Sequence, residues 1–149
     1  MYKQIVIAID GSELTPKVLE HAYALARLSK AAVEIVTVTE PSPLFMSGSE
    51  LITVSTQELL AELEKANAEQ AKALLDKAIA AAQTAGVEVT VRHIRQKVPS
   101  EGILQAAEDV KAELIVMGSH GRRGLNRFLL GSQANEVLTR SKIPVLIVK

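Results

Sequence analysis

Short runs of β-branched apolar residues alternate along this chain with longer stretches rich in alanine and leucine. Residues 5–9 (IVIAI) and 114–117 (LIVM) are continuously apolar, which is typical of strands buried on both faces of a parallel sheet. Residues 33–38 (VEIVTV) predict a third strand, and residues 87–92 (VEVTVR) alternate in polarity, which favours the edge of a sheet. Residues 143–148 (IPVLIV) predict a last strand whose proline lies near its start, where a missing N–H is tolerated.

Segments with the spacing of amphipathic helices fill the intervals between these strands. The first has Ser12 or Thr15 as its candidate cap. The second opens with the capping box Ser55-x-x-Glu58 and closes at Gly86. At the usual rise per residue it would be longer than about 40 Å, so we expect its first half to overhang the sheet. The helical segments are residues 13–29, 55–85, 100–111 and 132–141.

Strands that alternate with helices pair in parallel through right-handed crossovers. The chain therefore predicts a doubly wound α/β fold, with a five-stranded parallel sheet flanked by helices, in one domain spanning residues 1–149. The expected strand order is 3-2-1-4-5, in which the first and fourth strands are neighbours and lead to opposite faces. Ligands bind where that reversal occurs, so two segments are candidates for a site. These are Asp10-Gly11-Ser12 and the residues from Gly118 onward.

Composition and charge exclude several classes of function. Seventeen basic residues balance seventeen acidic ones, so no overall field attracts nucleic acid or an anionic membrane. The absence of cysteine excludes a disulfide framework, a zinc ribbon, an iron–sulfur cluster and thiol catalysis. The histidines, His21, His93 and His120, are too widely separated to indicate a metal centre. No apolar run reaches the ~18 residues of a membrane span or forms a signal-peptide core, and we expect a cytoplasmic protein.

The segment after the fourth strand reads GSHGRRGLNRFLLGSQ and carries the strongest motif in the chain. Its spacing is Gly118-x2-Gly121-x9-Gly131-Ser132, and the last helix begins at Ser132. Glycine allows the backbone to approach a ligand closely, and the first turn of a helix offers free N–H groups to phosphate. The segment also contains three arginines and no acidic residue. These arginines are Arg122, Arg123 and Arg127.

Two interpretations of this motif are open. The glycines can simply form a turn and a loop end, with Ser132 as a helix cap. Alternatively, the glycines, the serine and the basic loop together form a phosphate cradle, which their place at the reversal of strand order favours. Neither the G-x-x-x-x-G-K-[ST] nor the G-x-G-x-x-G fingerprint is present. The residues alone therefore predict a phosphorylated ligand and go no further.

The whole chain resembles the universal stress protein family in its single-domain form. The resemblance rests on IVIAIDGSE, VMGSHGRRGL, LLGSQANEVL and SKIPVLIVK, and on the long second helix. The glycine spacing is similar to the ATP-binding signature of that family, which some members lack. The resemblance implies that this chain binds ATP, or AMP or ADP, with any Mg²⁺ held by the phosphates.

The resemblance also implies which residues would contact the nucleotide. Asp10 would meet the ribose or the adenine, and the backbone of Val38 would bond the adenine. Ala8 and Met117 would line the adenine pocket. The glycines of the motif would let the ribose and phosphates approach, and the start of the last helix would supply phosphate donors. These motif residues are Gly118, Gly121, Gly131, Ser132 and Gln133.

Three further features have a structural and a functional interpretation. The family commonly has a glycine where this chain has Lys97, whose side chain either reaches the phosphates or narrows the pocket. His120 lies inside the cradle, where a solvated loop histidine is the more frequent outcome. The long helix carries an acidic face, which is usually only solvated but can also dock a basic partner. Its members are Glu58, Glu62, Glu64 and Glu69.

The leading functional hypothesis is an ATP-binding regulatory protein of the stress response, with no catalytic residues. No Ser/His/Asp constellation or paired carboxylates can be assembled from the sequence. One alternative is a slow ATPase or nucleotidyl-transfer enzyme, for which Asp10 would be the nearest acidic group. Another is a dimeric interaction module with a vestigial pocket. The sequence identifies no downstream protein partner.

The last strand predicts a homodimer. Residues Ile143 to Val148 carry no charge and would lie at the edge of the sheet, where unpaired backbone groups invite another strand. A two-fold axis would pair this strand with its own copy, and universal stress proteins often dimerise in this way. The alternative is a monomer whose edge is covered by the loop of residues 40–56.

Overall fold

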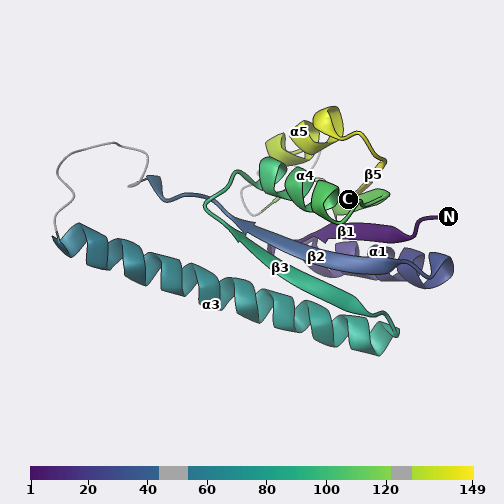
Figure 1. Ribbon diagram of the computed structural model, residues 1–149, viewed down its shortest axis with the longest axis horizontal. Coiled ribbons are helices and arrows are strands. Elements are labelled where there is room, and N and C mark those ends of the chain that lie inside the picture. Colours follow the sequence, from purple (N-terminus) through teal and green to yellow (C-terminus); the bar gives the residue numbers. More distant parts are fainter. Residues whose placement is uncertain (44–53, 122–128) are drawn as a thin grey trace.

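A computed structural model describes residues 1–43, 54–121 and 129–149. Its elements follow the alternation seen in the sequence (Figure 1). In chain order they are β1 (Gln4–Ala8), α1 (Thr15–Ser29), β2 (Ala32–Thr39), α3 (Val54–Ala85), β3 (Val89–Arg95), α4 (Pro99–Asp109), β4 (Leu114–Gly118), α5 (Ser132–Arg140) and β5 (Val145–Val148).

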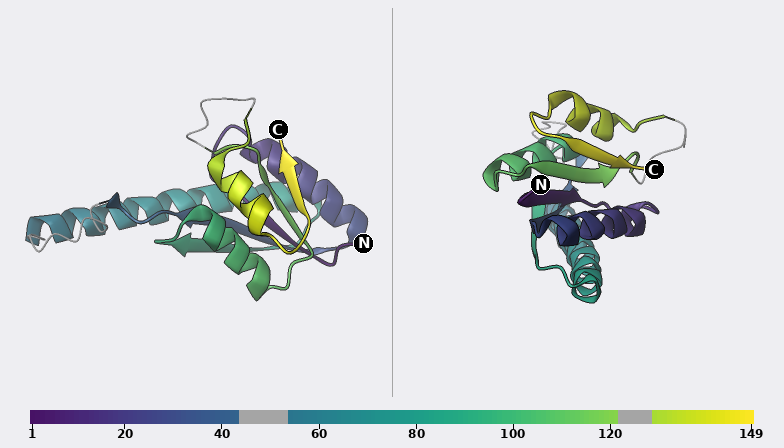
Figure 2. Two further views of the ribbon diagram at one scale, coloured as in Figure 1. Left: turned by 90° about the horizontal axis from the view of Figure 1, so that it is seen from above. Right: turned by 90° about the vertical axis from the view of Figure 1, so that its right-hand side faces the viewer.

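The strands form one parallel sheet in the order β3-β2-β1-β4-β5, which confirms the predicted fold and strand order. Helices α1 and α3 cover one face, and α4 and α5 cover the other (Figure 2). β1 lies at the centre and pairs with β2 on one side and β4 on the other. The predicted edge positions of the third and fifth strands are thus confirmed.

Each face of the sheet has its own hydrophobic cluster, and the alternation of side chains along β1 supplies both. Ile5 and Ile7 pack against α1 and α3, whereas Val6 between them packs against α4 and α5. All three are fully buried. A strand covered on both faces must be apolar at every position, which accounts for the unbroken run in the sequence.

Two strands start two residues later than predicted, because hydrogen bonds at the preceding helix or turn use the residues concerned. Gly86 closes α3 with a φ of 69°, and the N–H of Val87 donates to the carbonyl of Ala82. This capping occupies Val87, so β3 starts at Val89 and not at residue 87. β5 starts at Val145 because the Ser141 hydroxyl bonds both the N–H and the carbonyl of Ile143 in a turn.

The predicted cap of α1 is also wrong. The N-cap residue is Leu14, which makes no side-chain cap hydrogen bond. Ser12 instead offers its backbone carbonyl to the N–H of Thr15, at 3.1 Å. The Thr15 hydroxyl faces backwards and accepts the N–H of Gly11, at 3.1 Å. The Thr15 side chain and the Ser12 backbone therefore stabilise the loop that precedes the helix.

Helix α3 has 32 residues and extends well past the ends of the strands, as predicted (Figure 1). Its buried side chains are concentrated in the second half, where alanines let it lie close to the sheet and to α1. These buried residues are Ala71, Leu75, Ala78 and Ala82, with Leu60 in the first half. Tyr23 of α1, only 4% exposed, fastens the two helices by donating its hydroxyl to the Ala78 carbonyl at 2.7 Å.

Removal of the Tyr23 hydroxyl tests how much this bond stabilises the fold. We expect Tyr23→Phe to lower the free energy of unfolding by about 1 kcal/mol at neutral pH, measured by urea denaturation. Burial raises the pKa of Tyr23 from 10.0 to about 12. The folded state therefore favours the protonated phenol, and this contribution declines as the pH rises from about 10 to about 12.

The matched control for this prediction is Tyr2→Phe, which removes a phenol only partly buried at the border of the same cluster. We expect Tyr2→Phe to lose as much stability at alkaline pH as the wild type does, whereas Tyr23→Phe should lose less. Equal stability curves for the wild type and Tyr23→Phe between pH 7 and pH 12 would contradict the assignment.

Candidate functional site

The candidate site lies at the carboxyl ends of β1 and β4, which are neighbours in the sheet. The chain leaves β1 toward α1 on one face and leaves β4 toward α5 on the other. Three segments meet there: the loop after β1, residues 118–121 after β4, and residues 129–132 before α5. The arginines predicted for the cradle, Arg122, Arg123 and Arg127, lie outside the described residues.

Asp10 connects the first two of these segments. Its Oδ1 accepts the N–H of Ser12 at 2.9 Å and lies 3.5 Å from the Thr15 hydroxyl. Its Oδ2 faces Gly121, where an added Cβ would stand 2.7 Å from that oxygen. A side chain at Gly121 would therefore displace the Asp10 carboxylate or the loop.

Gly131 connects the last two segments through backbone contacts. Its N–H donates to the carbonyl of Ser119 at 2.7 Å. A Cβ on Gly131 would meet that carbonyl oxygen and the Cα of His120, each at 3.1 Å. Both neighbours belong to the backbone and have little freedom to move. The glycine thus lets the start of α5 approach the end of β4.

The first turn of α5 offers backbone donors to the site. Gly131 is the N-cap residue, in an extended conformation, and no side chain caps the helix. The first N–H of α5 with a partner in the preceding turn is that of Asn135, which donates to the Gly131 carbonyl at 2.9 Å. The N–H groups of residues 132–134 precede it and lack a partner within the helix. Such a terminus carries the positive end of the helix dipole and attracts anions.

The predicted phosphate donor Gln133 has a second role that the sequence did not indicate. Its side-chain Oε1 accepts the N–H of Ser100 at 2.9 Å. Ser100 is fully buried in the first turn of α4. The Gln133 amide therefore ties the N-termini of α4 and α5 together.

The side chains of Ala8 and Met117, which were predicted to line the adenine pocket, lie with that of Val38 on the face covered by α4 and α5. Met117 is only 6% exposed and belongs to the core cluster of that face, while Ala8 and Val38 are partly buried at its border. Val38 packs against Gly102 of α4, where an added Cβ would stand 2.9 Å from its side chain. Ala8 and Val38 can thus form a wall of the site, with Met117 beneath them.

The backbone of Val38 faces a gap that the departure of β1 creates. The Val36 carbonyl accepts the N–H of Ile9 at 3.0 Å, so it points toward β1. The Val38 carbonyl points the same way, because backbone directions repeat every second residue. The next N–H along that edge is that of Gly11, which donates to the Thr15 hydroxyl instead. Among the described residues, no N–H of β1 or of the loop after it is shown to bond the Val38 carbonyl.

His120 and Ser119 are further site residues whose placement the sequence did not settle. The Ser119 hydroxyl lies 3.2 Å from His120 Nδ1, and His120 Nε2 lies 3.6 Å from a carboxylate oxygen of Glu13. The His120 side chain is 9% exposed. The sequence placed His120 in the cradle as a solvated residue, whereas the structure packs it between the loop after β1 and the start of α5.

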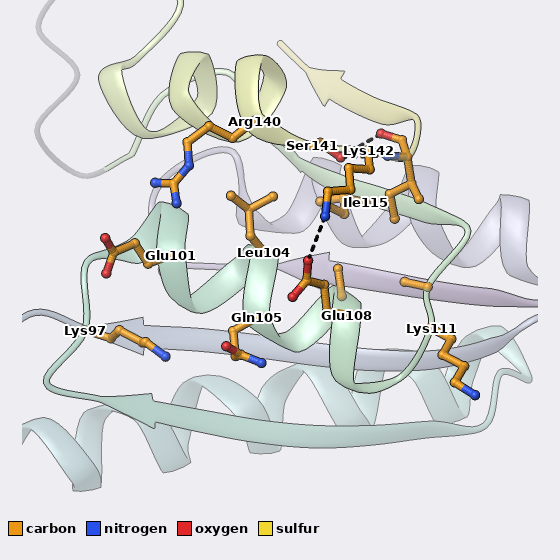
Figure 3. A pocket seen from close by; sticks show the side chains of 13 residues that line it. Lys97, Glu101, Leu104, Gln105, Glu108, Lys111, Ile115, Arg140, Ser141 and Lys142 are labelled. Atoms are coloured by element: carbon orange, nitrogen blue, oxygen red, sulfur yellow. Dashed lines mark hydrogen bonds and ion pairs between the residues drawn. The ribbon is translucent and has the colours of Figure 1, made fainter.

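Lys97 lies outside the cradle. Its N–H donates to the Thr39 carbonyl at 3.2 Å, and its side chain extends along α4 in the direction of Gln105 (Figure 3). Its positive charge contributes to lowering the pKa of Asp109, after Gln105 and Arg92. The sequence left two interpretations of Lys97 open, a phosphate contact or a narrowed pocket. The observed placement matches neither of them.

No group of three His, Cys, Asp or Glu side chains is placed to hold a metal ion within residues 1–43, 54–121 and 129–149. Over the same part of the chain, no helix has the length and apolar character needed to cross a membrane.

Comparison with known proteins identifies the family. The universal stress protein family model matches residues 1–149. The chain belongs to the universal stress protein family. The universal stress protein MJ0531 of Methanocaldococcus jannaschii is 37% identical over 149 residues, which cover 100% of this chain and 83% of that protein. The solved structure of MJ0577 from the same organism is 31% identical with a TM-score of 0.83, and the match covers 100% of this chain and 96% of that chain.

Two solved universal stress proteins with nucleotides are also similar to this one. The protein from Archaeoglobus fulgidus in complex with dAMP is 27% identical, with a TM-score of 0.69 and coverage of 99% of this chain and 98% of that chain. A universal stress protein in complex with cAMP is 28% identical, with a TM-score of 0.69 and coverage of 99% and 97%.

A double-mutant cycle tests the contact between Asp10 and Gly121 in this universal stress protein. We expect Gly121→Ala to destabilise the fold by about 1–3 kcal/mol, because the added methyl overlaps the Asp10 carboxylate. Combining it with Asp10→Ala should recover part of that loss, since the overlapping oxygen is gone. Chemical denaturation of the four proteins measures the coupling.

Gly118→Ala is the control for this cycle. Its added Cβ would meet the end of the Leu14 side chain at 3.3 Å, and that side chain can shift. Its stability should be independent of Asp10→Ala. Strictly additive effects of Gly121→Ala and Asp10→Ala would show that the two residues do not touch.

Proposed function

We propose that this universal stress protein binds adenine nucleotides, ATP in particular, between the loops that follow β1 and β4, and that it regulates a stress response. The observation that carries the proposal is the uncapped first turn of α5, held by Gly131 against the end of β4. The complexes of related universal stress proteins with dAMP and cAMP support the adenine nucleotide as the ligand class.

The proposed binding mode assigns one part of the site to each part of the nucleotide. The adenine lies at the sheet edge, where it bonds the backbone of Val38 beside Ala8. The ribose hydroxyls donate to Asp10 Oδ2, the carboxylate oxygen that faces Gly121. The phosphates accept the N–H groups of residues 132–134. Any Mg²⁺ would be held by the phosphate oxygens.

A bound nucleotide would contact three elements that lie far apart in the sequence. Asp10 belongs to the loop before α1, Gly121 to the loop after β4, and residues 132–134 to α5. The N–H of Ser119 also donates to the carbonyl of Val148 in β5, at 2.8 Å. A change in the cradle can therefore reach the edge of the sheet, which suits a regulatory role. A cytoplasmic location stays a prediction.

We propose further that β5 pairs with its own copy to form a homodimer. The four residues of β5 are all apolar, and β4 is its neighbour on one side only. The free edge has unpaired backbone groups that a second strand can bond. A two-fold axis places two such edges antiparallel. Residues 44–53, most of the loop that would cover the edge of a monomer, lie outside the described part of the chain.

Calorimetric titration with ATP, AMP and GTP tests the binding proposal. We expect ATP and AMP to bind and GTP to bind at least about tenfold more weakly, because the Val38 edge recognises the base. Gly131→Val should abolish ATP binding, since its side chain separates α5 from β4. Ala24→Val, on the exposed side of α1, is the matched control and should bind like the wild type.

Failure of every adenine nucleotide to bind a folded wild-type protein would contradict the proposal. So would a folded Gly131→Val variant with unchanged affinity. Circular dichroism of each variant shows whether it is folded.

The homodimer has its own test. Sedimentation equilibrium should give a mass near twice 16.0 kDa for the wild type. Leu146→Lys places a charge in the paired strand and should give the monomer mass. Leu138→Lys, on the exposed side of α5, is the control and should remain dimeric. A wild-type monomer at tens of micromolar, roughly the range of weak homodimers, would contradict strand pairing.

A further inference from the structure

The first ten residues of α3, which we call the overhang (residues 54–63), lie beyond the sheet (Figure 1). The overhang ends where Gln96 donates a hydrogen bond to Glu64, the next residue of the helix. Large apolar side chains remain exposed on it: Val54 by 72%, Leu59 by 48% and Leu63 by 40%. One leucine of the overhang, Leu60, is buried at 5% exposure, so the exposed apolar side chains lie on the remaining surface of the overhang.

The exposed side chains of the overhang form an acidic amphipathic surface. Leu59 and Leu63 are four residues apart and therefore lie on one stripe of the helix. Glu58 and Glu62 have the same spacing and lie beside them. The overhang contains no basic residue. A surface of this kind fits an apolar groove with a basic rim.

The opposite face of the molecule carries such a groove. It has a volume of about 590 Å³ and runs along α4, between that helix and the connection from α5 to β5 (Figure 3). Apolar side chains lie inside it, among them Leu104, Ile115 and Ile143. Basic side chains outnumber acidic ones around them. The basic residues are Lys97, Lys111, Arg140 and Lys142, and the acidic ones are Glu101 and Glu108.

Two of these basic side chains are already paired. Arg140 bonds Glu136 at 2.6 Å, and Lys142 lies 3.7 Å from Glu108. For Lys97 and Lys111, the part of the chain that the structure describes shows no ion pair. These two lysines are therefore available to carboxylates from outside.

We infer that the overhang of one copy of this chain docks in the α4–α5 groove of a second copy. The lengths match, because ten residues of helix span about 15 Å and the eleven residues of α4 about 16 Å. Leu59 and Leu63 would enter the apolar part of the groove, and Glu58 and Glu62 would meet its free lysines. The overhang extends from α3, which covers one face of the sheet, whereas the groove lies along α4 on the other face, so a chain cannot fill its own groove.

This contact differs from strand pairing in its symmetry. It joins two different surfaces, so each associated pair leaves one overhang and one groove open. Strand pairing through β5 joins identical surfaces and closes at two copies. The two modes can coexist, because the overhang lies on the other face and β5 itself is not part of the groove.

Sedimentation velocity in a Leu146→Lys background tests the inference without interference from strand pairing. We expect association that rises with protein concentration and weakens with added salt. Two double variants should each weaken this association by at least about tenfold. Leu59→Glu with Leu63→Glu removes the apolar side chains of the overhang. Lys97→Glu with Lys111→Glu reverses the charge of the groove. An equimolar mixture of the two should form a one-to-one complex, because each supplies the half that the other lacks.

The controls are Glu20→Lys on α1 and Lys77→Glu on the sheet-covering half of α3, which change exposed charges elsewhere. Both should associate like the parent. If the leucine variant is unfolded by circular dichroism, Glu58→Lys with Glu62→Lys replaces it. A parent that stays monomeric, or a mixture of broken variants that does not associate, would overturn the inference.

Discussion

Close approach at two glycines joins the segments of the candidate site: the Asp10 carboxylate lies against Gly121, and Gly131 donates its N–H to the Ser119 carbonyl. β1 and β4 are neighbours, yet the chain leaves them toward opposite faces, so the two loops diverge unless something joins them. Asp10 does this with one oxygen on the turn before α1 and the other against Gly121. The carboxylate can approach so closely only because glycine has no side chain.

The same junction extends beyond the cradle through Ser119. Its carbonyl accepts from Gly131, its N–H donates to Val148, and its hydroxyl lies beside His120. One buried residue thus contacts the start of α5, the end of β5 and the loop after β4. A displacement of the cradle by a ligand would act on the edge strand through this residue, and no other element needs to move.

The fold was predictable because burial on both faces of the sheet constrains every residue of a strand. The runs at 5–9 and 114–117 therefore stand out, and their alternation with helices determines the topology. Individual polar contacts were harder to predict from the sequence. Gln133 could be placed near phosphate from its motif, but its bond to Ser100 depends on how α4 and α5 pack. The orientation of Lys97 depends in the same way on the groove beside α4, which no local pattern reports.

Helix α3 has two sources of stability along its length. Its second half is covered by α1 and the sheet, so its amides open only when the core itself unfolds. Its first half has one buried side chain, Leu60, and otherwise depends on the propensity of alanine, leucine, glutamate and glutamine for the helix. A helical end of this kind frays on its own, and hydrogen exchange would be fast near Val54 and slow near Ala78. The protein thus carries a helical arm that can melt and re-form while the sheet and its core stay folded.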